Sequence, residues 1–192
     1  MGLVKAKGNM YPWVTHCHTH LRGACPHACP YCYVQAIGQR YGGEAHTGPI
    51  RLNTRELEVP YGSGRTIFVE HASDLFSRGV ETSWINSILE HCRTWPGNRY
   101  VFQTRNTARC SRWAAALPAK SMLGTTIETN RTAPGNAPHP KQRALALVPE
   151  LFGLIQRFVT IEPILDFDVD GMLKLLDIAR PDFVNIGADS KG

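Results

Sequence analysis

The sequence predicts an α/β fold, a partial and open barrel of six parallel strands in (β/α)6 order, like part of a TIM barrel. Short runs rich in β-branched and aromatic residues recur along the 192 residues, and helix-like segments separate them in strict succession. Such alternation implies right-handed crossovers and a parallel sheet. A closed barrel of eight strands usually needs about 250 residues, so we expect the barrel to stay open.

The expected strands span residues 13–17, 66–70, 99–104, 122–128, 157–162 and 182–187. The helices expected between them span residues 31–41, 82–95, 107–117, 141–155 and 168–180. A flat, doubly wound sheet is the alternative architecture, and both architectures place their ligands at the carboxyl ends of the strands.

Two longer segments interrupt this alternation. Residues 42–64 could hold a short extra strand, and residues 129–141 form a Pro-rich loop. We expect the Pro-rich loop to lie over the ligand site, because long loops at the carboxyl ends of strands commonly contact ligands.

The chain is expected to form a single domain over residues 1–192, because it is too short for two domains of ordinary size. The sequence stops after the sixth strand, so we expect the last helix to be absent. No apolar run reaches the roughly 20 residues of a membrane helix, and no signal peptide is evident, which favours a cytoplasmic location. The net charge of +5 favours an anionic partner such as nucleic acid, although the basic residues form no run.

Three of the six cysteines gather in the string "GACPHACPYCY", where Cys25, Cys29 and Cys32 have the spacing C-x3-C-x2-C. Thiols at this spacing in a chain without a signal peptide favour metal ligation over disulfides. Three thiolates on one loop can ligate three irons of a cubane cluster and leave the fourth iron open. The competing interpretation is a structural zinc ion, whose fourth ligand could be Cys17, His16, His18, His20 or His27.

The string resembles the cluster motif of the radical S-adenosylmethionine (SAM) superfamily, C-x3-C-x-aromatic-C, with Tyr31 as the aromatic residue. The succession of strands and helices resembles that superfamily's partial barrel over nearly the whole chain. The longer string "GACPHACPYCYVQ" looks most like the spore photoproduct lyase family. The strings "VEHASDLF", "GTTIETN", "VTIEPIL" and "VNIGADS" resemble a group of phage-associated radical SAM-like proteins of unassigned function.

This resemblance implies a [4Fe-4S] cluster on the three cysteines and SAM chelated at the open iron. Reductive cleavage of SAM would give a 5'-deoxyadenosyl radical that abstracts hydrogen from a substrate. An external electron donor is implied, such as a reductase, a flavodoxin or a ferredoxin-like protein. The fold does not fix the substrate, so a peptide or a small metabolite is an alternative to nucleic acid. Enzymes like spore photoproduct lyase return hydrogen to the product radical from a cysteine, and Cys17 is the candidate here.

The resemblance also implies SAM-binding residues just after the second strand, where the superfamily carries a GGE-like motif. Ser73 and Asp74 follow that strand and are expected near the methionyl ammonium, with Glu70 at the strand's end. A literal GGE string at residues 42–44 follows Cys32 too closely to end a second strand, so we interpret it as part of a loop.

Later strand ends supply the remaining expected contacts with SAM. Thr126 and Glu128 alternate onto one face of the fourth strand, toward the ribose hydroxyls. Glu128 would need a donor in a buried position, and Arg105 could be that donor. Arg105 could instead contact the SAM carboxylate or an anionic substrate. Glu162 is expected to face the ligand and Ala188 to lie near the adenine.

Two other classes of protein compete with the enzyme. A zinc-stabilised nucleic-acid-binding module without catalysis predicts one colourless metal ion, and a protein that only transfers electrons would need a fourth cysteine ligand. His16, His18 and His20 alternate on one face of the first strand and could hold a second metal, although a strand face near a polar site explains them as well.

Overall fold

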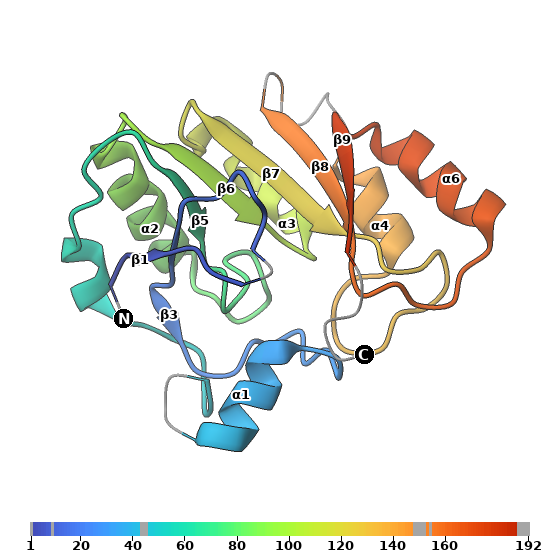
Figure 1. The fold of residues 1–192 in the computed structure, drawn as a ribbon, viewed down its shortest axis with the longest axis horizontal. Coiled ribbons are helices and arrows are strands. Elements are labelled where there is room, and N and C mark those ends of the chain that lie inside the picture. The colour runs from blue at the N-terminus through green and yellow to red at the C-terminus, as the bar shows by residue number, and fades with distance from the viewer. Residues whose placement is uncertain (1, 9, 43–45, 148–152, 154, 188–192) are drawn as a thin grey trace.

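A seven-stranded sheet forms the centre of the molecule, in the order β1-β2-β5-β6-β7-β8-β9 (Figure 1). The computed structural model describes residues 2–8, 10–42, 46–147, 153 and 155–187. The short strand β1 (Val4–Lys5) pairs antiparallel with β2 at one edge, and all other neighbours in the sheet are parallel. The six parallel strands are β2 (His16–His18), β5 (Thr66–Val69), β6 (Arg99–Gln103), β7 (Ser121–Thr126), β8 (Gln156–Ile161) and β9 (Phe183–Ile186).

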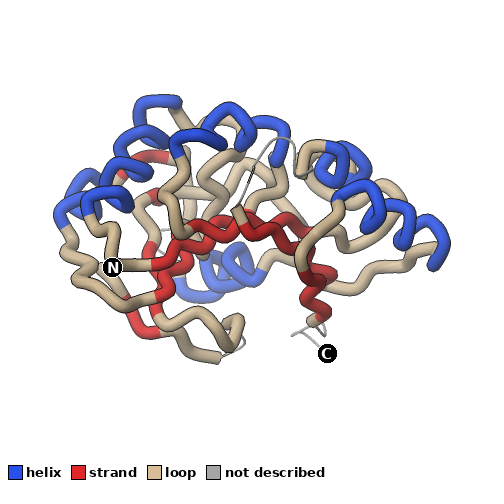
Figure 2. The backbone as a smooth tube through the Cα atoms, turned by 90° about the horizontal axis from the view of Figure 1, so that it is seen from above, coloured by secondary structure: helices blue, strands red, loops and turns tan. Residues whose placement is uncertain are grey.

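The parallel strands follow one another across the sheet in chain order. Each of the six overlaps a predicted strand, and the order never reverses. A doubly wound sheet requires a reversal, so that alternative is wrong. The sheet is open and curves into an arch with most helices on its outer side (Figure 2), which is consistent with the predicted partial barrel.

The helices are α1 (Tyr33–Tyr41), α2 (Thr82–Thr94), α3 (Thr107–Cys110), α4 (Pro140–Leu145) and α6 (Val169–Ala179). The single helix expected over 107–117 is wrong in detail, because α3 gives way to the 3-10 helix η2 (Ser111–Ala116) in the last turns before Pro118. The helix expected over 141–155 is shorter than predicted. α4 ends at Leu145, and residues 148–152 and 154 of the predicted helix lie outside the described residues.

The predicted extra strand in residues 42–64 is confirmed as β4 (Arg51–Leu52), which pairs antiparallel with β3 (Leu21–Arg22). The 3-10 helix η1 (Thr54–Glu58) follows β4. This small sheet braces the loop that leaves β2, because β3 lies between β2 and the three clustered cysteines.

Except for the edge strand β9, the parallel strands are largely buried on both faces, and alternate residues enter two different cores. Ile67 and Val69 of β5 pack with the outer helices, whereas Phe68 packs on the inner face with Phe158. Tyr11 packs on this inner face, where its ring stacks on that of Trp13 with centroids 4.7 Å apart and meets that of Phe158 edge-on. These aromatic rings do not fill the inner face at the carboxyl ends of the strands, so a space remains there.

In the described part of the chain, no helix is long and apolar enough to cross a membrane.

Candidate functional site

A cavity of about 1180 Å³ opens at the carboxyl ends of the parallel strands. Its walls come from the cysteine loop, from the edge segment at residues 4–8 and from the ends of β5, β6, β7 and β8. The predicted site residues that line it are Cys17, Cys25, Cys29, Tyr31, Cys32, Ser73, Asp74, Arg105, Thr126 and Glu162. Glu128 lies behind the wall, and Ala188 lies outside the described residues, as do Gly43 and Glu44 of the GGE string.

The cysteine loop is held by its own turns and by the Pro-rich loop. The amide of Cys32 donates to the carbonyl of Cys29 at 3.0 Å, and Ala28 takes a positive φ of 48°. The amide of Asn136 donates to the carbonyl of His27 at 2.7 Å. Gly135, at φ 107°, lies so close that a Cβ there would come within 2.8 Å of the same carbonyl oxygen. Residues of the predicted Pro-rich loop therefore do pack on the cysteine loop.

The thiols of the loop are free of disulfides and partly buried. Burial, followed by the negative charge of Asp74, raises the pKa of Cys25 to about 12, and burial also raises the pKa of Cys29. Three neighbouring thiolates would therefore need a bound cation, since metal coordination deprotonates a thiol outright.

The three thiols do not all lie within 4.8 Å of one another, since the only trio of potential ligands that close among the described residues is His18, His20 and His91. A single zinc ion with Zn–S bonds of about 2.3 Å would bring its sulfurs to within about 4 Å of one another. In this structure the three thiols are therefore not all as close together as the ligands of one zinc ion would be.

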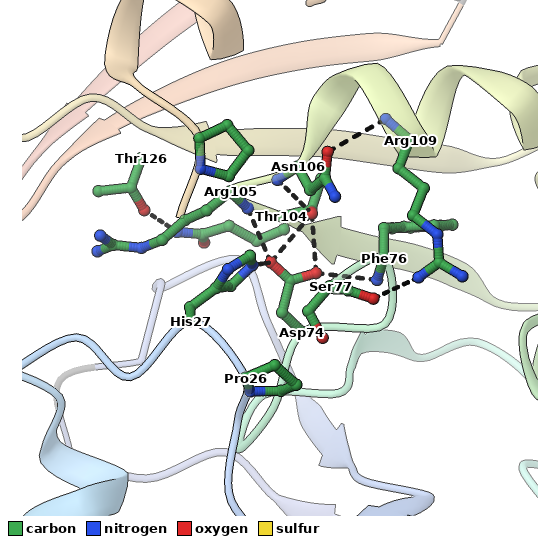
Figure 3. Close-up of polar contacts among 12 residues, drawn as sticks. Pro26, His27, Asp74, Phe76, Ser77, Thr104, Arg105, Asn106, Arg109 and Thr126 are labelled. Carbon is green, nitrogen blue, oxygen red and sulfur yellow. Dashed lines mark hydrogen bonds and ion pairs between the residues drawn. The ribbon is translucent and has the colours of Figure 1, made fainter. Parts of the chain in front are cut away.

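Asp74 ties the cysteine loop to the ends of β5 and β6 (Figure 3). Its Oδ2 accepts hydrogen bonds from Nε2 of His27 at 2.7 Å and from the amide of Arg105 at 2.8 Å. Its Oδ1 accepts from the amide of Phe76 at 2.9 Å and from the hydroxyl of Thr104 at 2.8 Å. Burial disfavours the charge, but His27 and the other donors outweigh it and hold the pKa of Asp74 below its usual value.

These bonds give Asp74 a role that the sequence did not suggest. The carboxylate expected near the methionyl ammonium is occupied by the protein's own donors, and it positions His27 between the first two cysteines. The neighbouring Ser73 differs, because its Oγ is buried and has no hydrogen-bond partner within the described structure. Ser73 lines the cavity and is thus the residue of this pair whose side chain has unused hydrogen-bonding capacity.

Glu128 is completely buried and forms a second bridge to the cysteine loop. Its Oε1 accepts from the hydroxyl of Tyr31 at 2.6 Å and from Nη1 of Arg105 at 2.7 Å, and its Oε2 accepts from Nη1 of Arg143 at 2.7 Å. Arg105 also donates to the Tyr31 hydroxyl. Burial works against ionisation, but the two guanidinium groups and Tyr31 hold the pKa of Glu128 below its usual value.

Arg105 is thus the donor that a buried Glu128 was expected to need. The carboxylate predicted to face the ribose supports Tyr31 and Arg105 instead, and Arg143 is a partner that the sequence did not reveal.

The floor of the cavity is a chain of neutral polar groups. The hydroxyl of Tyr11 donates to Oε1 of Gln103 at 2.6 Å and lies 2.7 Å from Oγ1 of Thr160. The amide group of Gln103 donates to Oγ1 of Thr126 at 3.1 Å. Sequence reasoning missed Tyr11, Gln103 and Thr160, although Gln103 and Thr160 are polar residues near strand ends and that position was a usable signal.

Cys17, on β2, faces the cavity from the strand that precedes the cysteine loop. Its side chain is 4% exposed, and burial raises its pKa to about 11. The thiol therefore keeps its proton at neutral pH.

Comparison with protein families matches residues 11–191 to the model described as "Protein of unknown function (DUF5131)". Comparison with curated proteins finds no significant match. Among solved structures, the fold is similar to a spore photoproduct lyase mutant with bound AdoMet and dinucleoside spore photoproduct. The TM-score is 0.62 at 16% identity, over 90% of this chain and 54% of that chain. A second mutant of the same enzyme gives a TM-score of 0.62 at 16% identity, over 92% of this chain and 56% of the other. The chain thus spans about half the length of these structures.

Proposed function

The chain belongs to the DUF5131 family, and we propose that it is a radical SAM enzyme with a [4Fe-4S] cluster on Cys25, Cys29 and Cys32 and SAM in the adjoining cavity. One observation carries the proposal: three free thiols of one loop line a cavity at the carboxyl ends of parallel strands. Folds of this kind place their ligands at that end. The likeness to spore photoproduct lyase supports a radical SAM-like fold.

The residues present fit these cofactors. Small-molecule sites commonly measure about 300–1,000 Å³. A cavity of about 1180 Å³ therefore leaves room for SAM and for part of a substrate. The buried Oγ of Ser73, which has no partner in the described structure, offers a hydrogen bond that SAM would satisfy.

When bound, the cluster and SAM would supply a one-electron cleavage that yields a 5'-deoxyadenosyl radical for hydrogen abstraction. The protein's part is to bind and orient. Ser73 would bind the amino or carboxylate group of SAM, and Thr126 and Glu162 would bind ribose hydroxyls. Arg105, already paired with a carboxylate, would add positive charge next to the SAM carboxylate. The adenine would lie near the backbone after β9, at Ala188.

Asp74 and Glu128 are positioning residues in this proposal. Each uses its carboxylate to hold one side of the cysteine loop, Asp74 through His27 and Glu128 through Tyr31. Charged hydrogen bonds in buried places are stronger than neutral ones, so the two bridges should fix the directions of the thiols. Cys17 would be the hydrogen donor to the product radical, because its thiol is protonated and faces the cavity.

Nucleic acid is the proposed substrate class, with an external reductase, flavodoxin or ferredoxin-like protein as electron donor. Lys5 and Lys7 line one edge of the cavity, and the net charge of +5 favours a polyanion. The similar lyase structure holds a dinucleoside photoproduct. If the substrate is instead a peptide or a small metabolite, oligonucleotides at low salt should not compete with it for binding to the protein.

The experiment that tests the proposal uses anaerobically purified and reconstituted protein. We expect about four irons per chain and release of 5'-deoxyadenosine from SAM after reduction with dithionite. Cys29→Ala should lose both. Cys110→Ala, a matched change at a buried thiol on α3, should retain both.

A colourless protein that binds zinc through the loop cysteines, loses that zinc in Cys29→Ala and does not cleave SAM would refute the proposal and favour the zinc-stabilised nucleic-acid-binding module.

A further inference from the structure

Three buried histidines lie together on the outer side of β2, opposite the cavity. His18 and His20 are 0% exposed and His91, on α2, is 7% exposed. One ring nitrogen of each lies within 4.8 Å of the others. Side chains alternate along a strand, so His18 on β2 points away from Cys17, which lines the cavity. The rings of His20 and His91 lie beside that of His18, with centroids 4.3 Å and 6.1 Å from it. The trio is therefore separate from the cysteine loop.

The outer ring nitrogen of each histidine is bonded to an acceptor. A carboxylate or a carbonyl can only accept, so each of these nitrogens carries a hydrogen and the inner nitrogen of a neutral ring carries a lone pair. The pairs are His18 Nε2 with Glu56 Oε2 at 2.9 Å, His20 Nδ1 with Glu70 Oε1 at 2.7 Å, and His91 Nε2 with the Val59 carbonyl at 2.9 Å. Metal-binding histidines are typically oriented in this way by a second acceptor.

The inner nitrogens face one another with too few hydrogens among them. His20 Nε2 and His91 Nδ1 lie 2.9 Å apart, and neither has a hydrogen to donate while both rings are neutral. The hydroxyl of Tyr61 lies 2.6 Å from His18 Nδ1 and 3.2 Å from His20 Nε2. Its one hydrogen can satisfy only one of the three lone pairs. Facing lone pairs in a buried site are costly unless a cation lies between them.

We propose that His18, His20 and His91 bind one divalent transition-metal ion, with the Tyr61 oxygen as a fourth ligand. Zinc suits a closed, buried site of three imidazoles and one oxygen. Zinc–nitrogen bonds of about 2.0–2.1 Å place tetrahedral ligands about 3.3 Å apart, so the pair at 2.9 Å needs to open by only a few tenths of an ångström.

The site joins elements that are far apart in the sequence. It links β2 to α2 and to the segment before β5, which carries Tyr61. β2 leads through β3 into the cysteine loop, and Glu70, which holds His20, lines the cavity from the other side. The metal is thus a structural clip that fixes the base of the cysteine loop.

The test removes the competing thiols first. A variant with Cys25, Cys29 and Cys32 changed to Ala is produced in zinc-supplemented medium and its zinc is measured by mass spectrometry. We expect about one zinc per chain, and less than about a fifth of that after His91→Gln in the same background. His16→Gln is the matched control, because His16 lies on the same strand but outside the trio, and it should keep the zinc.

A cobalt titration of the same variant, without any histidine substitution, gives a second readout that does not depend on the folding of His91→Gln. Four-coordinate cobalt should give intense visible absorption that zinc displaces. Two results would overturn the inference. In the first, the folded variant binds neither zinc nor cobalt, which would mean that an extra proton satisfies the facing nitrogens. In the second, zinc is retained after His91→Gln. Because this variant lacks the cluster ligands, its outcome is independent of the radical SAM proposal.

Discussion

Replacing Asp74 by Asn separates the positioning role of this residue from a direct role in binding SAM. The carboxylate accepts from His27, Thr104 and two backbone amides, those of Phe76 and Arg105. An Asn side chain has one acceptor oxygen and an NH2 group, which would point at donors. Whichever way the amide turns, one backbone amide loses its acceptor and meets a donor instead.

The expected cost follows from the burial of this network. A buried donor left without a partner costs about 1–3 kcal/mol, and bonds to a charged group contribute about 1.5–3 kcal/mol. We expect Asp74→Asn to lower the free energy of unfolding by about 2–4 kcal/mol in urea titrations followed by tryptophan fluorescence, and to reduce the iron retained after reconstitution. Asp166→Asn is the control. Asp166 pairs with Arg131 on the surface with its side chain 81% exposed, so the change should cost less than about 1 kcal/mol.

A different pattern would refute the positioning role. If Asp74→Asn kept the stability and the iron content of the unchanged protein but bound SAM more weakly, the carboxylate would act on the ligand rather than on His27. Stability and iron content are independent of SAM, so they separate the two roles.

Three further results are expected. Gly135→Ala should reduce iron retention several-fold without changing the protein's tryptophan spectrum. Alanine is strained at φ 107°, and its Cβ would lie 3.3 Å from the Cys29 Cα and push the cysteine loop aside. Full retention of iron would contradict this packing. Arg143→Met should lower the free energy of unfolding by about 3 kcal/mol or more in urea, since it removes one of two cations from a fully buried carboxylate. In metal-free protein the pKa of His18 is lowered from 6.5 to about 4, chiefly by burial and then by His20. The unfolded chain therefore binds a proton that the folded chain does not, and unfolding titrations at several pH values should show stability falling by on the order of 3 kcal/mol from pH 6.5 to pH 4, less steeply in His18→Gln.

The strands were predictable because their signal is local. A run such as residues 66–70 is apolar and β-branched whatever it pairs with, and six such runs separated by helices predict a parallel sheet. They left the strand order open between a partial barrel and a doubly wound sheet, and the folded chain decides it. The two-residue strands β1 and β3 have no periodicity of their own. Val4 pairs with Cys17 and Leu21 with Leu52, and only the folded chain brings these partners together.

For the candidate site, the residues that line the cavity were largely predictable, but the contacts that hold them in place were not. The spacing of Cys25, Cys29 and Cys32 is a local pattern, and polar residues at strand ends converge in any parallel sheet. The partner of His27 is 47 positions away and that of His20 on α2 is 71 positions away. No local pattern pairs such residues, so the sequence indicated which side chains gather at the cavity and not which groups hold them in place.

The contacts that other elements make with the cysteine loop hold it in its folded conformation. Three contacts from different elements fix it: Asp74 on His27, Glu128 on Tyr31, and the amide of Asn136 on the His27 carbonyl. Each is made within the protein and needs no bound metal. A loop held by three such contacts is pre-organised, so cofactor binding does not have to supply the free energy of ordering it. Removal of the cluster should therefore leave the fold intact, in contrast to small zinc domains that unfold without their metal. Circular dichroism before and after chelation would show this, and loss of the helical signal on chelation would contradict it.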